Sequence, residues 1–461
     1  MAVSSLLGVG RTGLVTHTLG SGMASHGASN VATPGFSRRA LELAGIAPPP
    51  RHGGGVQALG IRRVIDPFVE RRLLGARADA GFATRRAMAL GTLDRVLSDD
   101  AGLGAALDAF ETAVADLAAY PGDRAARTQM LARAEGLATA FRSAATEIRL
   151  GVEEADQRIE MEVREVSGAL EEIARLGEEI AKSEVRGEEA SDLRDHRDEL
   201  VRQVADRVPV TVVTHPDGRM SLLLKGGLPL VSPDGASPLQ TVRDPVTGRV
   251  RIERVTAGAA QDVTNSVTSG SIGGLLAARD GALADARADL DQLAFDVASA
   301  YNAVHAAGFG LDGVAGRDLF APPAAAAGAA EAMAVSAAVA GNPDAIGASL
   351  DPLALPGDNR NALALAALAD APIAGGATRT VQGALADLLA EAGSAIRAAT
   401  EGAGRADAVL AQTQALRDSV SGVSLDEQML DLMQYQRAYQ ASLRVIEVAD
   451  QMLEDLLALK R

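Results

Sequence analysis

The sequence predicts a mainly α-helical protein with a small β domain, in which both halves of the chain contribute to a long coiled-coil-like helical bundle. Long stretches carry apolar residues at steps of three and four, the period of one face of a helix. One stretch, residues 208–262, instead has short β-type runs separated by turn residues. Because helical patterns precede and follow this stretch, we expect the second helical half to fold back onto the first.

Residues 1–60 are interpreted as a weak helix, a turn and a loop. A helix is expected over the first 28 residues, where four positions are one heptad apart: Leu7, Leu14, Ser21 and Ala28. Glycines weaken this helix, since each costs about 1 kcal/mol relative to Ala: Gly8, Gly10, Gly13, Gly20, Gly22 and Gly27. Thr33-Pro34-Gly35 predicts a turn. The Pro/Gly-rich residues 45–60 predict a loop that can contain an extended segment.

Residues 61–207 are expected to form a long helical body. The helical pattern runs from Pro67 to about Val204 and is broken once, at Pro121-Gly122. Within it, Glu and Arg alternate with an apolar face made of Ile159, Val163, Val166, Leu170, Ile173, Leu176 and Ile180. Such a face suits a coiled coil and, equally, a long helix in an ordinary bundle.

The segment 208–262 is predicted to be a small antiparallel β domain. Its β-type runs are residues 210–214, 220–224, 228–231 and 250–255. Turn residues separate them: His215-Pro216-Asp217-Gly218, Ser232-Pro233-Asp234-Gly235 and Asp244-Pro245.

The chain then returns to helix. We expect three parts: a returning helical segment over 263–320 with helix from 272 to about 305; an Ala/Pro/Gly-rich loose connection over 321–357 with one helix near 328–340; and a helical body over 358–420 with helices at 359–370 and 381–418.

The C-terminal residues 421–461 predict a long amphipathic helix without a partner nearby in the sequence. Ser424 and Glu427 form an S-x-x-E capping box at its start. Its apolar face consists of Leu425, Met429, Leu432, Tyr439, Leu443, Ile446, Leu453 and Leu457. A helix of this kind needs other helices to pack on.

The composition excludes several classes of function. The net charge of −16 argues against nucleic acid as a partner, because phosphate binding needs a basic surface. The absence of cysteine excludes thiol catalysis, disulfides and Cys-ligated zinc. The six histidines have no metal-ligand spacing, and no carboxylate pair or nucleophile motif stands out, so we expect no catalytic, metal or cofactor site. We also expect no membrane insertion and no cleaved signal peptide.

A dinucleotide-binding alternative rests on Gly8-Val9-Gly10-Arg11-Thr12-Gly13, which matches G-x-G-x-x-G. The motif's usual acidic residue about 20 positions later is missing, since the first acid of the chain is Glu42. No βαβ alternation follows. We therefore interpret these glycines as positions that let a neighbouring helix come close, and we do not expect an enzyme.

Five segments together resemble the family of flagellar hook-associated protein 1, the first junction protein between the bacterial hook and filament. Asn30 with Thr33-Pro34-Gly35-Phe36 resembles the N-terminal signature N-x-x-T-P-G-[YF] that rod, hook and junction proteins share. Four further segments resemble sequences of the junction protein itself: 193–200 (LRDHRDEL), 269–280 (SGSIGGLLAARD), 357–365 (GDNRNALAL) and 421–427 (SGVSLDE). Members often carry a large outer insertion, whereas this chain has only the Ala-rich connection between Phe320 and Gly357.

The resemblance implies a structural, non-enzymatic subunit whose N- and C-terminal helices pair as an inner coiled-coil domain. Family members are exported through the flagellar type III apparatus and assemble as a ring at the hook tip, outside the cell. The implied partners are further copies of the chain, the hook protein, the third hook-associated protein and an export chaperone. The assembly residues are then the apolar face of the C-terminal helix together with Leu7, Leu14, Asn30, Thr33, Pro34, Gly35 and Phe36. Another axial subunit is the alternative. We expect residues 1–40 and 420–461 to be mobile in the monomer and to order on incorporation.

Overall fold

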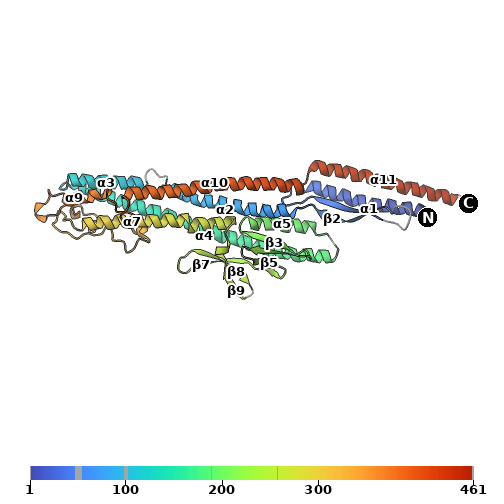
Figure 1. The fold of residues 1–461 in the computed structure, drawn as a ribbon, viewed down its shortest axis with the longest axis horizontal. Coiled ribbons are helices and arrows are strands. Elements are labelled where there is room, and N and C mark those ends of the chain that lie inside the picture. Colours follow the sequence, from blue (N-terminus) through green and yellow to red (C-terminus); the bar gives the residue numbers. More distant parts are fainter. Residues whose placement is uncertain (1, 47–53, 98–101, 188, 257, 459–461) are drawn as a thin grey trace. The chain divides into compact units, whose positions relative to one another are not determined.

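The computed structural model describes residues 2–46, 54–97, 102–187, 189–256 and 258–458 (Figure 1). Its contacts divide the chain into two compact units. The first consists of Met1–Gly81, Glu162–Gly270 and Ala406–Arg461, and the second of Phe82–Met161 and Ser271–Arg405. Each unit is therefore built from segments far apart in the sequence. Three long helices contribute residues to both units: α2 (Pro67–Leu97), α4 (Arg124–Val185) and α10 (Val381–Ser421).

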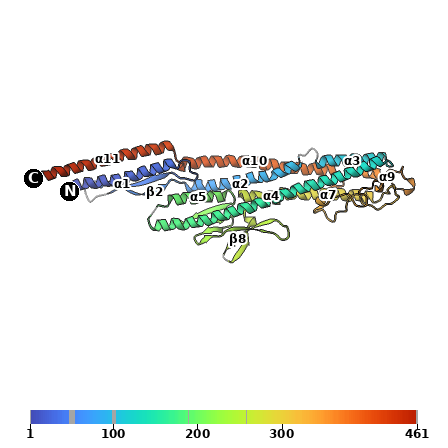
Figure 2. The same ribbon diagram turned by 180° about the vertical axis from the view of Figure 1, so that it is seen from behind.

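The two ends of the chain meet in the first unit. Helix α1 (Ala2–Ser29) lies antiparallel to α11 (Leu425–Ala458), and Figures 1 and 2 show the two side by side. A β-hairpin of β1 (Arg39–Gly45) and β2 (Val56–Arg63) packs on α1, where the Thr16 hydroxyl donates to the Val56 carbonyl at 3.3 Å. The predicted pairing of the terminal helices is confirmed.

The rest of the first unit combines the end of α4 with α5 (Ser191–Ala205) and two small antiparallel sheets. One sheet has the order β3-β4-β5-β6 and the other the order β7-β8-β9. Their strands are β3 (Val210–Thr214), β4 (Met220–Leu224), β5 (Leu228–Ser232), β6 (Gly235–Ala236), β7 (Leu239–Arg243), β8 (Val250–Thr256) and β9 (Ala259–Asp262). A 3-10 turn, η1 (Thr264–Ser266), follows. The four predicted β-type runs all lie in strands.

The apolar face predicted on α4 is the core face of that helix. All seven of its residues, from Ile159 to Ile180, are at most 2% exposed. The expected helical region nevertheless has more interruptions than the one at Pro121-Gly122. Helix α2 ends at Leu97, α3 (Leu103–Ala119) begins after it, and α4 stops before Gly187, which has a φ of +72°. Glycine adopts this left-handed conformation without strain, so the chain can turn there into α5.

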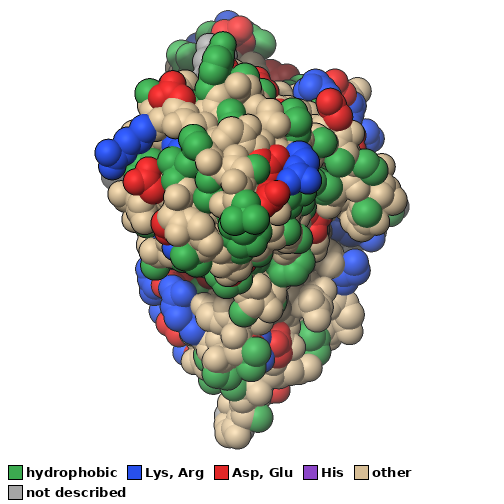
Figure 3. Space-filling model, turned by 90° about the vertical axis from the view of Figure 1, so that its left-hand side faces the viewer, with side chains coloured by type: hydrophobic (Ala, Val, Ile, Leu, Met, Phe, Trp, Pro, Cys, Tyr) green, Lys and Arg blue, Asp and Glu red, His purple; other side chains and the backbone are tan. Residues whose placement is uncertain are grey.

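The second unit packs around one aromatic cluster. Phe110 of α3 lies 5.0 Å from the ring of Tyr301 and 5.8 Å from that of Phe320, measured between ring centroids. The unit contains parts of α2, α4 and α10. Its other α-helices are α3, α6 (Gly270–Asp280), α7 (Ala282–His305), α8 (Ala329–Ala332) and α9 (Arg360–Ala366). Among the described residues, three short 3-10 helices complete it: η2 (Pro343–Ala345), η3 (Pro352–Ala354) and η4 (Ala367–Ala369). Figure 3 views the end of this unit at which α9 lies, where charged side chains are sparse among hydrophobic side chains and backbone.

The Ala-rich residues 321–357 are packed, and the expectation of a loose connection is wrong. Ala330, Met333, Val339 and Ile346 are at most 3% exposed and belong to the core of the second unit. The segment has little regular structure because buried polar side chains satisfy its backbone instead. Arg127, for example, is fully buried and donates to the Ile346 carbonyl at 2.8 Å. Only α8 forms where a longer helix was expected.

Candidate assembly surface at the paired terminal helices

Glycines of α1 set how closely α1 and α11 pack. In three pairs, a Cβ placed on the glycine would lie 2.3–2.5 Å from a side chain of α11: Gly13 against Ser442, Gly20 against Tyr435 and Gly27 against Gln428. Each step is seven residues forward in α1 and seven backward in α11. This is the register of an antiparallel coiled coil whose seam needs a residue without a side chain.

The glycines of α1 therefore have two different environments. Gly10 also faces α11, where an added Cβ would lie 2.5 Å from Ile446 Cγ1. Gly8 and Gly22 have no neighbouring atom within 4 Å of such a Cβ. Four of the six glycines thus serve the helix contact, and the G-x-G-x-x-G run lies inside a continuous helix. A dinucleotide motif requires a strand-to-helix turn at that point, so the geometry does not support the nucleotide-binding alternative.

The predicted apolar face of α11 lies at the edge of this contact. Leu432, Ile446 and Leu453 are half-buried. The other predicted positions remain exposed by 37–68% and form what we call the outer strip: Leu425, Met429, Tyr439, Leu443 and Leu457. On α1, the predicted Leu7 and Leu14 are half-buried. The pairing of one α1 with one α11 therefore leaves an apolar strip in solvent.

The prediction missed the residues at the centre of the seam. Gln428 is 5% exposed and Ala449 is fully buried, and Tyr435 and Ser442 lie between them at steps of seven. The signal was present in the sequence as a second heptad on α11 opposite the heptad of Gly13, Gly20 and Gly27. Because this second heptad holds Gln, Tyr, Ser and Ala, hydrophobicity alone does not reveal it.

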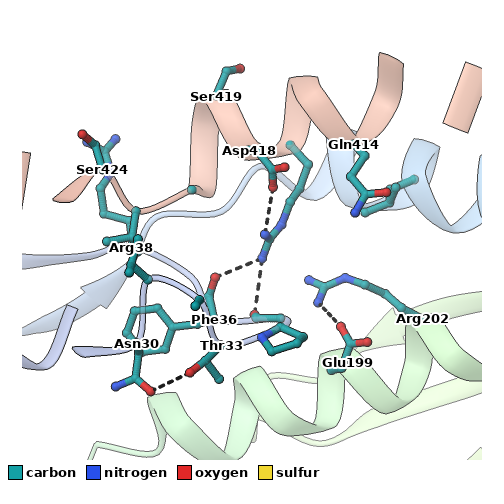
Figure 4. Close-up of a pocket in the computed structure, with 18 of the residues that line it drawn as sticks. Asn30, Thr33, Phe36, Arg38, Glu199, Arg202, Gln414, Asp418, Ser419 and Ser424 are labelled. Atoms are coloured by element: carbon teal, nitrogen blue, oxygen red, sulfur yellow. Dashed lines mark hydrogen bonds and ion pairs between the residues drawn. The ribbon is translucent and has the colours of Figure 1, made fainter. Parts of the chain in front are cut away.

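The loop after α1 folds against itself and against the end of α10 (Figure 4). The Thr33 hydroxyl donates to Asn30 Oδ1 at 3.0 Å, and Asn30 Nδ2 donates to the His26 carbonyl at 3.0 Å. Phe36 is 7% exposed and its ring lies 5.5 Å from that of His26. Pro34 is exposed. The polar residues of the signature thus close the loop, and its aromatic residue anchors it.

Gly35 and Arg417 connect this loop to the helices around it. Gly35 has a φ of +80°, and an added Cβ would lie 2.9 Å from Glu199 Cβ of α5. Arg417 of α10 donates to the carbonyls of Gly35 at 3.3 Å and Phe36 at 3.2 Å, and lies 3.5 Å from Glu70. The loop, α5 and the junction of α10 with α11 border a cavity of about 790 Å³.

The expected capping box of α11 forms only in part. The Ser424 hydroxyl accepts from the Glu427 amide at 3.5 Å, while the Glu427 carboxylate pairs with Arg38 at 3.2 Å. Arg38 is the residue whose amide donates to the Ser421 carbonyl at 2.8 Å. Glu427 therefore ties the start of α11 to the N-terminal segment and does not bond back to its own cap.

The segment 193–200 of α5 binds the β1–β2 hairpin through charge. Arg63 lies 2.9 Å from Asp195 and 2.7 Å from Asp198, and its side chain is 7% exposed. Arg39 also lies 3.5 Å from Asp195. Burial raises the pKa of the Asp195 carboxyl above its ordinary value, and the neighbouring guanidinium of Arg63 opposes that rise. The Asp residues of the LRDHRDEL segment thus hold the N-terminal hairpin on α5.

Within the described ranges, no group of three or more His, Asp or Glu side chains is arranged to hold a metal ion. None of the described helices has the length and apolar composition needed to cross a membrane.

Comparisons with known proteins agree with this architecture. The protein-family model of the flagellar hook-associated protein FlgK helical domain matches residues 90–320. The protein-family model of the C-terminal region of the flagellar basal body rod FlgEFG proteins matches residues 414–459. The flagellar hook junction protein FlgK from Burkholderia pseudomallei has the same fold, with a TM-score of 0.68 at 18% identity over 76% of this chain and 100% of that one.

Curated relatives named flagellar hook-associated protein 1 align with much of the chain. The protein of Salmonella typhimurium is 30% identical over 69% of this chain and 59% of its own length. That of Escherichia coli is 29% identical over 69% of this chain and 60% of its own. The chain therefore spans about three fifths of these two relatives. The Bacillus subtilis protein is 26% identical over 92% of this chain and 89% of its own length.

A helical body with a small β domain, together with a C-terminal helix that matches the rod-protein model, defines a structural protein of the bacterial flagellum. Since the FlgK helical-domain model covers half of the sequence, the chain belongs to the family of flagellar hook-associated protein FlgK.

Proposed function

We propose that this protein is the junction subunit that links the flagellar hook to the filament. The relatives that carry the name hook-associated protein 1 and the solved hook junction protein support this role. Export through the flagellar type III apparatus, assembly as a ring at the hook tip and an extracellular location belong to the same proposal. Its partners are then further copies of the chain, the hook protein, the third hook-associated protein and, before export, a chaperone.

The single observation that carries the proposal is the outer strip of α11. These five apolar side chains lie beside the α1–α11 seam and remain 37–68% exposed in the described part of one subunit. Burying each side chain fully is worth about 1.5–3 kcal/mol, so a second helix pair placed on the strip would gain several kcal/mol. Neighbouring subunits arranged around an axis supply such helix pairs to one another.

The test separates the outer strip from the seam. Leu443→Asp places a charge on the strip, and Gln434→Asp places one at an exposed polar position of α11 outside the strip. Both variants are expressed in cells that lack their own copy of the protein, and their flagella are imaged. We expect Leu443→Asp to leave hooks without filaments and to shed flagellin into the medium, whereas Gln434→Asp restores filaments.

The purified Leu443→Asp protein must show the same amide-exchange pattern as the wild-type monomer, which shows that the substitution acts on assembly and leaves the isolated subunit unchanged. Filaments attached normally by that variant would contradict the role of the outer strip. A deletion strain that lacks hooks altogether would instead favour the alternative of a hook or rod subunit.

Ordering of the chain ends on incorporation is a further part of the proposal. The exposed strip supports it, because an α1–α11 pair that leaves this much apolar surface in water is only partly stabilised. Limited proteolysis of the monomer should cut within residues 1–40 and 420–461 before it cuts the two compact units elsewhere. Complete resistance of both ends would contradict this part.

A further inference from the structure

The edge of strand β3 carries unpaired backbone groups. Strand β3 is the first in its sheet and pairs with β4 alone among the described strands. The His215 amide donates to the Arg219 carbonyl at 2.8 Å, which fixes every second residue of β3 as bonded to β4. Val212 and Thr214 are the alternate residues, so their N–H and C=O groups point away from β4.

Strand β3 has no charged residue, proline or bulge, three features that keep sheet edges from pairing. The strand reads VTVVT over Val210–Thr214, without a charge or a proline, and its register with β4 shows no bulge. Proteins normally protect an exposed edge with one of these features. An edge of β-branched residues without them is suited to accept another strand.

A groove lies beside this edge strand. Its cavity of about 490 Å³ is lined by Val212, Thr214 and Met220 on the inner face of the sheet, by Pro67 and Leu74 at the start of α2, and by side chains of α5. All of these residues belong to the first unit. The volume lies in the range of about 300–1,000 Å³ found for ligand sites. Because α2 stands opposite the edge, the groove suits one extended segment better than the edge of a second sheet.

The charges of the groove favour an acidic occupant. Its carboxylates already have arginine partners: Glu70 with Arg202, Glu184 with Arg194, and Asp198 with Arg63. Arg71 is exposed and has no carboxylate partner among the described residues. Its guanidinium lies 5.0 Å from the centre of the ring of the exposed Phe68, and Arg71 itself lines the groove. An Asp or Glu of a bound segment can pair with this free cation.

We propose that the groove between β3 and α2 binds an extended acidic segment of a partner protein by β-strand addition. The outward N–H and C=O groups of Val212 and Thr214 bond the backbone of the segment, and Arg71 selects its acidic side chain. This surface lies between the β domain and α2 and does not involve the terminal helices, so it is independent of the junction role proposed above.

The probe is a seven-residue peptide of alternating Val and Thr with a central Asp, titrated into the full-length protein by calorimetry. A second peptide carries a central Lys in place of the Asp. We expect the Asp peptide to bind with a dissociation constant below 1 mM, on the order of tenfold tighter than the Lys peptide. Hydrogen exchange should slow at the amides of Val212 and Thr214 when the Asp peptide is bound.

Three variants test the geometry. Val212→Pro removes an N–H that points away from β4, so the sheet is retained while binding falls at least tenfold. Arg71→Glu should reverse the preference between the two peptides. Arg72→Glu is the matched control, since Arg72 is exposed and lies outside the groove lining, and it should keep the preference.

Two results would overturn the proposal. One is the absence of binding by either peptide, or binding that Val212→Pro and Arg71→Glu leave unchanged. The other is self-association of the wild-type protein that Val212→Pro abolishes and the Asp peptide does not compete with. That result, measured by sedimentation, would assign the edge to a second copy of the chain.

Discussion

Gly20 of α1 lies directly against the ring of Tyr435 of α11, so that a Cβ on the glycine would come within 2.5 Å of the Tyr Cε1 atom. The glycine lowers the helix propensity of α1 and, at the same time, permits the close contact of the two chain ends. The lower helix propensity is a local cost, whereas the close helix contact stabilises the tertiary structure. The balance between them can be measured at single positions.

The first prediction compares Gly20→Ala with Gly22→Ala. Overpacking at Gly20 costs about 1–3 kcal/mol, which exceeds the gain of about 1 kcal/mol in helix propensity. Gly22 has open space around it, so its replacement should stabilise α1 by about 1 kcal/mol. Amide exchange of α1 measures both changes. Equal stabilisation by the two substitutions would mean that the seam tolerates a methyl group.

The second prediction concerns the charge pairing between the hairpin and α5. Arg63→Ala leaves two buried or half-buried carboxylates, Asp195 and Asp198, without this partner, and should cost about 3–5 kcal/mol. Arg62→Ala removes the neighbouring pair with Glu42, whose side chains are at least 50% exposed, and should cost at most about 1 kcal/mol. Urea unfolding followed by circular dichroism measures both. Similar losses would contradict the role of burial.

The third prediction follows from the buried Arg127 of the second unit. Its guanidinium donates to the carbonyls of Pro121 at 2.6 Å and Ile346 at 2.8 Å. Arg127→Lys keeps the charge but cannot reach both carbonyls with a planar fork, so we expect a loss of about 1–3 kcal/mol. Arg124→Lys, on an exposed side chain one turn earlier, should change stability by less than about 0.5 kcal/mol. Thermal unfolding distinguishes the two.

The fourth prediction is a pH dependence that arises from His305. Its Nδ1 donates to the Arg317 carbonyl at 2.7 Å and its Nε2 accepts from the Gly347 amide at 3.0 Å, so the ring is neutral in the folded state. Burial lowers the pKa of His305, with Arg317 and Arg127 adding to the effect and Asp318 and the Arg317 carbonyl opposing it. The unfolded state then binds the proton more readily. Stability should therefore fall as the pH drops below about 6.5, the ordinary pKa of His.

The measurement compares wild type with His305→Leu at pH 7.5 and pH 5.5 by urea unfolding. The variant should be less stable at pH 7.5 by about 1–3 kcal/mol, because two buried polar groups lose their partner. It should also lose less stability on acidification than the wild type does. Contributions of His17, whose pKa burial also lowers, are common to both proteins and cancel in the difference. An unchanged pH dependence would show that His305 can accept a proton in the folded state.

Sequence reasoning succeeded where a pattern is complete within one element. The face from Ile159 to Ile180 was predicted from its spacing and is buried throughout. The predictions failed where the conformation of a segment depends on a contact with a residue distant in the sequence. Glu427 fits a capping box but pairs with Arg38, and residues 321–357 resemble a linker but fold around Arg127 and Asn361. Polar side chains that bond backbone carbonyls leave no periodic signal in a sequence.

By itself, the sequence determined most of the helical regions and four of the strands, that the terminal helix needs partners, and which family the chain resembles. The tertiary structure decided which side of that helix is the seam. The seam formed on the heptad of Gln428, Tyr435, Ser442 and Ala449, because glycines at the other end of the chain leave room for a closer approach there than on the more apolar face. Helical periodicity is a local property of the chain, whereas close packing depends on both surfaces at once.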